Sequence, residues 1–172
     1  MAVDTGGSTT TLSARTLDHP ISGERFVFLE SSGETDGELL AFELTLQPGG
    51  RVPGGPVHPG QEERFHVEAG RMWFRRGLRT VIAGPGDFVV VPPRTYHRFA
   101  NAGEEPARVR VEVRPPLEMR RLYETVVALA REGRTLPSGL PRPLDLALFM
   151  REFDDEVEAP IAPGSSEPCR HR

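Results

Sequence analysis

The sequence predicts an all-β domain, a sandwich or a barrel, followed by two amphipathic helices. The first observation is a series of short runs rich in β-branched and aromatic residues, separated by glycine and proline. The second is strict alternation over residues 108–113, where Val109, Val111 and Val113 share one face. The third is a change of apolar period from two to about 3.6 after Pro115. Many short strands with regular turn signals are typical of a sandwich or barrel.

The expected strands occupy the runs between these turn signals. They cover residues 25–30, 39–46, 64–68, 71–75, 80–83, 88–91, 96–99 and 108–113. Around the third run, alternation puts Glu63, Phe65 and Val67 on one face and Arg64 and His66 on the other.

Two helices are expected after the strands. The first ends before Gly133 and carries apolar residues at helical spacing: Leu122, Val126, Leu129 and Ala130. The second begins at Pro143, which suits a first helical turn, and its apolar residues are Leu146, Phe149, Met150 and Phe153. We expect both apolar faces to pack against the outer surface of the β domain or against a partner subunit. A helix in this position could also cap the mouth of a barrel.

Length and composition predict one domain with two loose ends. A chain of 172 residues is long enough for a single core. Residues 1–10 and 158–172 are small, polar or proline-rich, and we expect them to be disordered. The β domain then takes residues 11–115 and the helical extension residues 116–157.

Charge and composition argue against several classes of partner. The net charge of -4 and the pI near 5.8, without a basic run, argue against nucleic acid. The sequence contains no long apolar run of the kind that predicts insertion into a membrane or secretion. We therefore expect a cytoplasmic protein with no membrane partner. The single cysteine, Cys169, predicts neither an intrachain disulfide nor a cysteine metal cluster.

Three residues with acid/base or metal-ligand chemistry are placed to meet. His58 precedes Glu63 by five residues, and His97 lies in a second β-rich segment. By alternation Glu63 shares a face with Phe65, and His97 shares one with Phe99. Two imidazoles and a carboxylate among apolar neighbours suit a divalent metal or an acid/base site.

These two segments resemble the paired motifs of the cupin superfamily. The second motif, G-x5-P-x-G-x2-H-x3-N, is matched at Gly86, Pro92, His97 and Asn101, with Arg94 in place of the central glycine. The first motif, G-x5-H-x-H-x(3,4)-E-x6-G, is matched at His58, Glu63 and Gly70, with Pro56 in place of the first histidine. The resemblance covers roughly residues 38–115 and implies a small jelly-roll barrel.

The resemblance also implies a site and an activity. Its ligand set would be His58, Glu63 and His97, with Fe, Mn, Ni or Zn as candidate metals, and Pro56 removes the usual fourth ligand. With metal, these residues would support an oxygenase or a Lewis-acid reaction. Without metal, they would be catalytic acids and bases in a cyclisation, isomerisation or dehydration. We expect a homodimeric enzyme of secondary metabolism that acts on a small, largely apolar molecule; the alternative is a non-catalytic ligand-binding or sensor protein.

An aromatic wall is expected beside these three residues. The candidate substrate-binding residues are Phe42, Phe65, Met72, Phe74, Phe88 and Phe99, with Arg94 at the rim to meet a carboxylate or phenolate. Core packing is the alternative role for the apolar ones. Strand alternation predicts that the side chains of Glu62, Arg64 and His66 point outward, so we do not expect them to be ligands. Trp73 lies outside if Met72 and Phe74 face inward.

Overall fold

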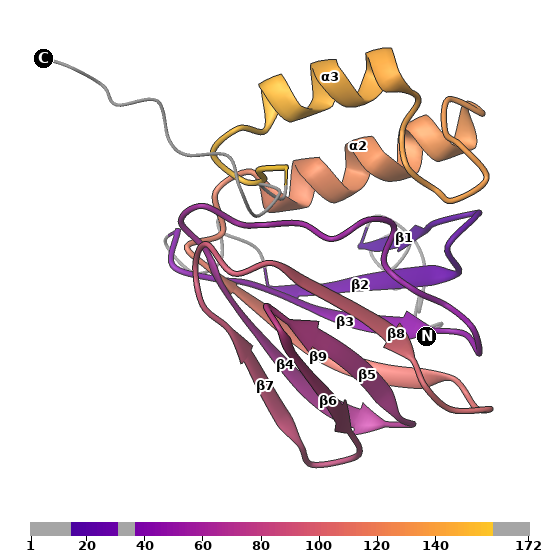
Figure 1. The fold of residues 1–172 in the computed structure, drawn as a ribbon, viewed down its shortest axis with the longest axis vertical. Helices are drawn as coiled ribbons and strands as arrows, with labels where there is room; N and C mark the ends of the chain where they lie inside the picture. Colours follow the sequence, from indigo (N-terminus) through magenta and orange to yellow (C-terminus); the bar gives the residue numbers. More distant parts are fainter. Residues whose placement is uncertain (1–14, 31–36, 160–172) are drawn as a thin grey trace, which may run out of the picture.

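The computed structural model describes residues 15–30 and 37–159. They form two antiparallel β-sheets and two helices (Figure 1). The larger sheet runs in the order β1 (Thr16–Asp18), β2 (Glu24–Glu30), β3 (Leu40–Leu46), β9 (Ala107–Arg114), β4 (Glu62–Ala69), β7 (Phe88–Val91). The smaller sheet runs in the order β6 (Arg79–Ala83), β5 (Met72–Arg76), β8 (His97–Asn101). The predicted β-rich domain is confirmed as a jelly-roll-like arrangement, but the two sheets are not closed into the barrel that we expected.

Alternation along β4 and β9 selects the side chains that form the interior. Glu63, Phe65 and Val67 are buried on β4, whereas His66 is exposed, as the sequence predicts. The three valines of β9 are likewise buried between charged neighbours. Most buried apolar side chains of both sheets, together with Met119, Leu122 and Phe149 of the two helices, belong to one hydrophobic core.

The first strand was not predicted. β1 has only three residues, and it is held by antiparallel pairing with β2, in which Leu17 lies opposite Phe26. A strand this short carries too little alternation to be seen in a sequence. β2 also begins one residue earlier than expected, at Glu24, which brings this carboxyl group to the end of the sheet.

The helices α2 (Met119–Arg131) and α3 (Pro143–Glu152) lie side by side along one side of the sheets (Figure 1). We expected their apolar faces on the outer surface of the β domain or against a partner subunit, and the expectation of the outer surface is wrong. The structure agrees instead with the alternative that a helix covers the mouth of the β domain. Residues of both helices line an interior cavity together with strand residues, because their apolar faces close the space that the open sheets leave. Within the described residues, no helix is long and apolar enough to cross a membrane.

The chain after α3 returns to the loop that carries His58. Val57 and Glu158 exchange two backbone hydrogen bonds of 2.8 and 3.4 Å. Glu158, which we expected in a disordered tail, is therefore ordered by this pairing. The remaining parts of the expected disordered ends, residues 1–10 and 160–172 with Cys169, lie outside the described residues.

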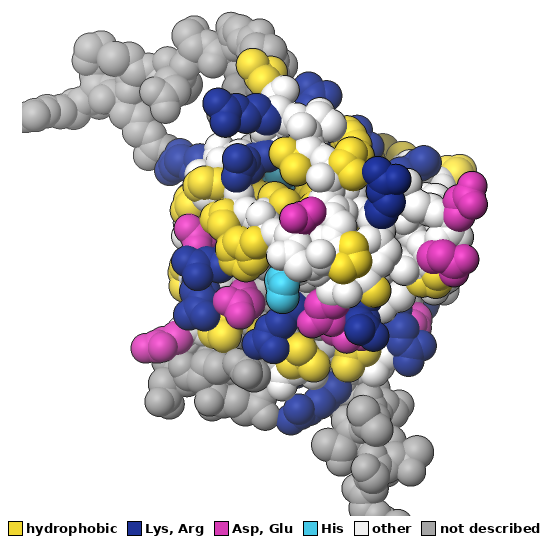
Figure 2. All heavy atoms as spheres, turned by 90° about the horizontal axis from the view of Figure 1, so that it is seen from below, with side chains coloured by type: hydrophobic (Ala, Val, Ile, Leu, Met, Phe, Trp, Pro, Cys, Tyr) yellow, Lys and Arg dark blue, Asp and Glu magenta, His cyan; other side chains and the backbone are white. Residues whose placement is uncertain are grey.

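The face shown in Figure 2 carries arginine and acidic side chains interspersed with hydrophobic ones. A nucleic-acid-binding surface usually has a continuous basic patch or stripe, which this face does not show.

Candidate functional site

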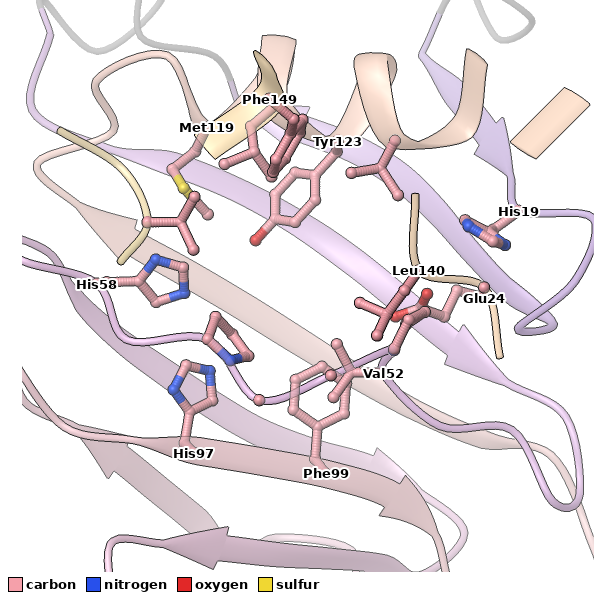
Figure 3. Close-up of a pocket in the computed structure, with 18 of the residues that line it drawn as sticks. His19, Glu24, Val52, His58, His97, Phe99, Met119, Tyr123, Leu140 and Phe149 are labelled. Carbon is pink, nitrogen blue, oxygen red and sulfur yellow. The ribbon is translucent and has the colours of Figure 1, made fainter. Parts of the chain in front are cut away.

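A cavity of about 380 Å³ lies between the sheets and the two helices. Most of its lining is apolar, and the acidic and histidine residues that reach it are His19, Glu24, His58, Glu63, His97 and Glu158. No arginine lines this cavity in the described part of the chain. His58 and His97 lie at one end of it, and His19 and Glu24 lie at the other (Figure 3).

The two motif segments come together through backbone hydrogen bonds. The N–H group of Arg94 donates to the carbonyl of His58 at 2.8 Å, and the N–H group of His97 donates to the carbonyl of Pro56 at 3.3 Å. His58 therefore lies in the loop before β4, directly beside the start of β8. Glu63 reaches the same place from β4, because its position on the inner face aims it at the interior.

The three predicted site residues meet at one point. Glu63 Oε2 lies 2.8 Å from His97 Nε2 and 3.6 Å from His58 Nε2. All three side chains are buried, and one ligand atom from each lies within 4.8 Å of the others. The arrangement has the two-histidine, one-carboxylate composition of many metal sites with open coordination positions.

Hydrogen bonds on the far side of each imidazole decide which nitrogen faces the centre. His58 Nδ1 lies 2.6 Å from the carbonyl oxygen of Glu156, and His97 Nδ1 lies 3.3 Å from that of Thr95. A carbonyl only accepts, so in each ring Nδ1 carries the hydrogen. In the neutral rings the lone pairs of both Nε2 atoms then face Glu63, which is the orientation that metal-binding histidines have.

The central carboxylate oxygen lacks an ordinary partner. Glu63 Oε2 is buried and has no well-directed hydrogen bond from the described residues, in spite of its short distance to His97. Two lone pairs that face each other repel unless a second proton or a cation lies between them. These residues therefore fit a divalent metal ion, and they equally fit a carboxylate paired with a protonated histidine.

The charges at this site shift the pKa values of Glu63 and His97. Burial alone raises the pKa of Glu63, but the charges of His58 and His97 and the short contact with His97 outweigh burial and bring this pKa to about 2. Burial lowers the pKa of His97, yet the charge and contact of Glu63, with the bond to Thr95, raise it overall. The pair thus favours a carboxylate beside an imidazolium when no metal is bound.

Comparison with known proteins identifies the family. The family model of the cupin domain matches residues 42–114, a range that contains all three site residues. Residues 42–114 of this chain form a cupin domain.

Two solved structures resemble this cupin. One is a predicted oxalate decarboxylase from Thermotoga maritima, with 20% identity, coverage of 54% of this chain and 80% of that chain, and a TM-score of 0.52. The other is the cupin domain of Cnp3 from Schizosaccharomyces pombe, with 16% identity, coverage of 67% and 80%, and a TM-score of 0.51. At these identities the likeness shows the fold alone. A search of curated proteins gave no match.

The predicted aromatic wall of the cupin is only partly present. Phe42, Phe65 and Phe99 line the cavity. Met72 and Phe74 are buried in the core, but they do not line the cavity.

The expectation for Phe88 is wrong. Its side chain is 56% exposed on β7, where it lies opposite the outward-facing His66 of β4. Register with β4 decides the outcome, because paired residues of two strands share a face. Phe88 therefore lies outside the cavity.

Arg94 lies away from the cavity. It is exposed in the turn before β8, has a φ of 60°, and is not among the cavity-lining residues. The outward positions expected for Glu62, Arg64 and Trp73 agree with the structure, in which all three are partly exposed. Glu62 and Arg64 form an ion pair of 2.6 Å on the outer face.

His19, Glu24 and Tyr123 are among the cavity residues that the sequence analysis missed. Glu24 could have been found, because it is in phase with Phe26 on β2 and therefore faces inward. Tyr123 follows Leu122 on the inner side of α2, and its hydroxyl points into the cavity (Figure 3). Burial, followed by the charges of Glu63 and Glu24, raises the pKa of Tyr123 well above its usual value, so the phenol stays protonated.

Proposed function

We propose that this cupin is an enzyme that binds a divalent transition metal through His58, Glu63 and His97 and acts on a small, largely apolar organic molecule. The observation that carries the proposal is the orientation of the two imidazoles. Both Nδ1 atoms face backbone carbonyls, and both Nε2 atoms face the buried Glu63 oxygen at the end of an apolar cavity.

Each group of cavity residues has a separate role in the proposed enzyme. A metal ion held by two histidines and one carboxylate supplies Lewis-acid or oxygen chemistry, and Fe, Mn, Ni and Zn are the candidates. Phe42, Phe65 and Phe99 form apolar walls that suit a flat or hydrophobic substrate and limit the access of water. Tyr123 keeps its proton and serves as a hydrogen-bond donor to the substrate. Pro56 lines the cavity without offering a ligand atom.

A metal-free enzyme is the second candidate, and the contact between His97 and Glu63 favours it. The His97 imidazolium, 2.8 Å from the buried Glu63 carboxylate, holds a proton at the end of the cavity. Such a pair can deliver a proton to a substrate and take one back, which a cyclase, isomerase or dehydratase requires. The metal-dependent version would belong to the oxygenase or Lewis-acid classes.

A non-catalytic ligand-binding or sensor protein is the alternative from another class. A binder would hold its ligand unchanged, and substitution of His97 would alter affinity alone. An enzyme with His97→Ala would keep binding the substrate but lose turnover. Single-turnover analysis of a bound candidate substrate separates these outcomes.

The test of the metal proposal is elemental analysis of the protein purified without chelators, followed by titration with Zn²⁺, Fe²⁺, Mn²⁺ and Ni²⁺. We expect about one metal ion per chain in the wild type and a dissociation constant raised at least tenfold in His97→Ala. His66→Ala is the matched control, because His66 is an exposed histidine of β4 that faces away from the site. Equal affinity in wild type and His97→Ala would favour the acid/base enzyme.

We also propose a cytoplasmic homodimer that acts in secondary metabolism. The support for a homodimer is a set of exposed apolar side chains on β6, on β7 and in the turn before β6: Leu78, Val81, Ile82 and Phe88. Sedimentation equilibrium of wild type and of Phe88→Ser tests the dimer, which should weaken in the variant. A monomeric wild type would contradict it.

A further inference from the structure

The turn between β1 and β2 builds a second polar group of residues, at the end of the cavity opposite His58 and His97 (Figure 3). The N–H group of His19 donates to the carbonyl of Glu24 at 2.8 Å, which closes the turn. The N–H groups of Ile21 and Ser22 donate to His19 Nδ1 at 3.3 and 3.1 Å. The Ser22 hydroxyl donates to Glu24 Oε2 at 2.6 Å. These bonds hold both side chains in defined positions.

The two backbone donors determine the tautomer of His19. Because Nδ1 accepts both N–H groups, its lone pair is used and the ring proton lies on Nε2. Burial lowers the pKa of His19, so the ring is neutral with this single proton. The Nε2 atom is buried and has no hydrogen-bond partner among the described residues. A buried donor without a partner is costly unless something else binds it.

Glu24 offers an acceptor beside this donor. It is only 5% exposed and lines the cavity. Ser22 occupies Oε2, and no hydrogen bond from the described residues reaches Oε1. Burial raises the pKa of Glu24 to about 7, against the smaller lowering effect of the Ser22 hydroxyl. With a pKa of about 7, the Glu24 carboxyl group takes up or loses a proton easily near neutral pH. Its charged form is a strong hydrogen-bond acceptor.

The space between the two ends is apolar. The rings of Phe26 and Phe42 pack on Tyr123, with centroids 5.0 and 5.2 Å from it. Tyr123 lines the cavity between these two ends (Figure 3). No arginine in the described lining could neutralise an anionic group, and both ends already hold carboxylates.

We propose that His19 and Glu24 form a second subsite, which binds a hydroxyl group at the far end of an elongated apolar ligand whose other end lies at His58, Glu63 and His97. A hydroxyl accepts from the His19 Nε2–H group and donates to Glu24, so one ligand group satisfies both residues. The inference rests on the proposed function, because it assumes that this cavity holds the substrate. It narrows the substrate class to neutral, largely apolar molecules with polar groups at two ends, such as hydroxylated aromatic compounds.

The probes are 2-naphthol and 2,6-dihydroxynaphthalene, two flat apolar molecules that differ by one hydroxyl at the far end. Their dissociation constants for the full chain are measured by fluorescence titration. The readout is the ratio of the constant for 2-naphthol to that for the diol, in which general effects on the apolar cavity cancel. We expect wild type to prefer the diol and this ratio to fall roughly tenfold in Glu24→Leu.

Two further variants guard against misfolding and non-specific effects. His19→Asn should lower the ratio as well, although the asparagine Oδ1 can still accept the two backbone N–H groups of the turn. Glu43→Gln should leave the ratio unchanged, because Glu43 lies on the neighbouring β3 and pairs with Arg108 outside the cavity. Melting temperatures of all variants confirm that they fold.

A ratio that is the same in wild type, Glu24→Leu and His19→Asn would overturn the second subsite, as would the absence of binding of either naphthol. Failure of the proposed function is recognised separately. If the metal titration shows no dependence on His97 while the diol preference depends on Glu24, the subsite holds and the metal proposal fails.

Discussion

His97 Nε2 lies 2.8 Å from Glu63 Oε2, although His97 begins β8 in the three-stranded sheet and Glu63 lies on β4 in the six-stranded sheet. The contact therefore joins the two sheets across the interior. It is buried, and its partners carry opposite charges when no metal is bound. Breaking one partner of such a pair is expected to affect stability as well as ligand binding.

The pH dependence of stability should report this pair in metal-free protein. The pKa of Glu63 is about 2 in the fold against an ordinary value of 4.5, so its contribution is complete above about 4.5 and is lost as the pH falls toward 2. The raised pKa of His97 gives the opposite pH dependence. The contribution of the protonated His97 ring to the free energy of unfolding is complete below pH 6.5 and is lost as the pH rises through the raised pKa. The pair therefore stabilises the fold most between about pH 4.5 and 6.5.

Urea unfolding of wild type and Glu63→Gln from pH 3 to 8, with a chelator present, measures this contribution. The free energy of unfolding of wild type should fall more steeply below pH 4.5 than that of the variant. Parallel curves for the two proteins would show that Glu63 is not charged beside His97.

Replacing Pro56 with histidine should supply the missing fourth ligand. Pro56 lines the cavity and its carbonyl accepts from the N–H group of His97, a bond that the substitution preserves. We expect the dissociation constant of Zn²⁺ to fall by tenfold or more in Pro56→His. Pro93→His is the control, because Pro93 is exposed in the turn before β8. If Pro56→His binds no more tightly than wild type, and His97→Ala no more weakly, the acid/base role takes the place of the metal.

Gly55 should be required for the shape of the loop that carries His58. A Cβ atom at position 55 would lie 2.4 Å from Cε2 of Tyr96, too close for the ring to stay in place. We expect Gly55→Ala to lower the free energy of unfolding by about 1–3 kcal/mol and to weaken metal binding. Gly60→Ala, where an added Cβ meets nothing within 4 Å, is the control. Similar stability and affinity for the two variants would mean that the loop adapts.

The helices should be needed for the integrity of the cavity. Phe153 is fully buried and packs on Phe149 with ring centroids 4.9 Å apart, so Phe153→Ala should lower the free energy of unfolding by about 3–5 kcal/mol. Leu148→Ala, at a residue that is 55% exposed, should change it by less than about 0.5 kcal/mol. Truncation after Pro116 should cause aggregation, because it uncovers the apolar lining. An equally stable truncated protein would show that the helices are dispensable.

The sequence by itself determined the faces of the strands and the identity of the three central residues. Alternation is a local property of an extended chain, so the inward position of Glu63 and the outward position of His66 follow from their places in one strand. The resemblance of the two segments to the paired cupin motifs identified His58 and His97. Alternation did not help with Phe88, because its strand reads Phe-Val-Val-Val and is apolar on both faces. Only the pairing with β4 set its phase.

Tertiary structure decided everything that depends on distant segments. The carbonyl that orients His58 belongs to Glu156, which is 98 positions away in the chain. The helices α2 and α3 cover one side of the cavity, but in the sequence their apolar faces would fit several surfaces equally well. His19 belongs to a hairpin that a three-residue strand defines, so no local pattern could aim it at the cavity. Short-range patterns specify which side of an element is buried, whereas the partner that buries it is chosen by packing between elements far apart in the chain.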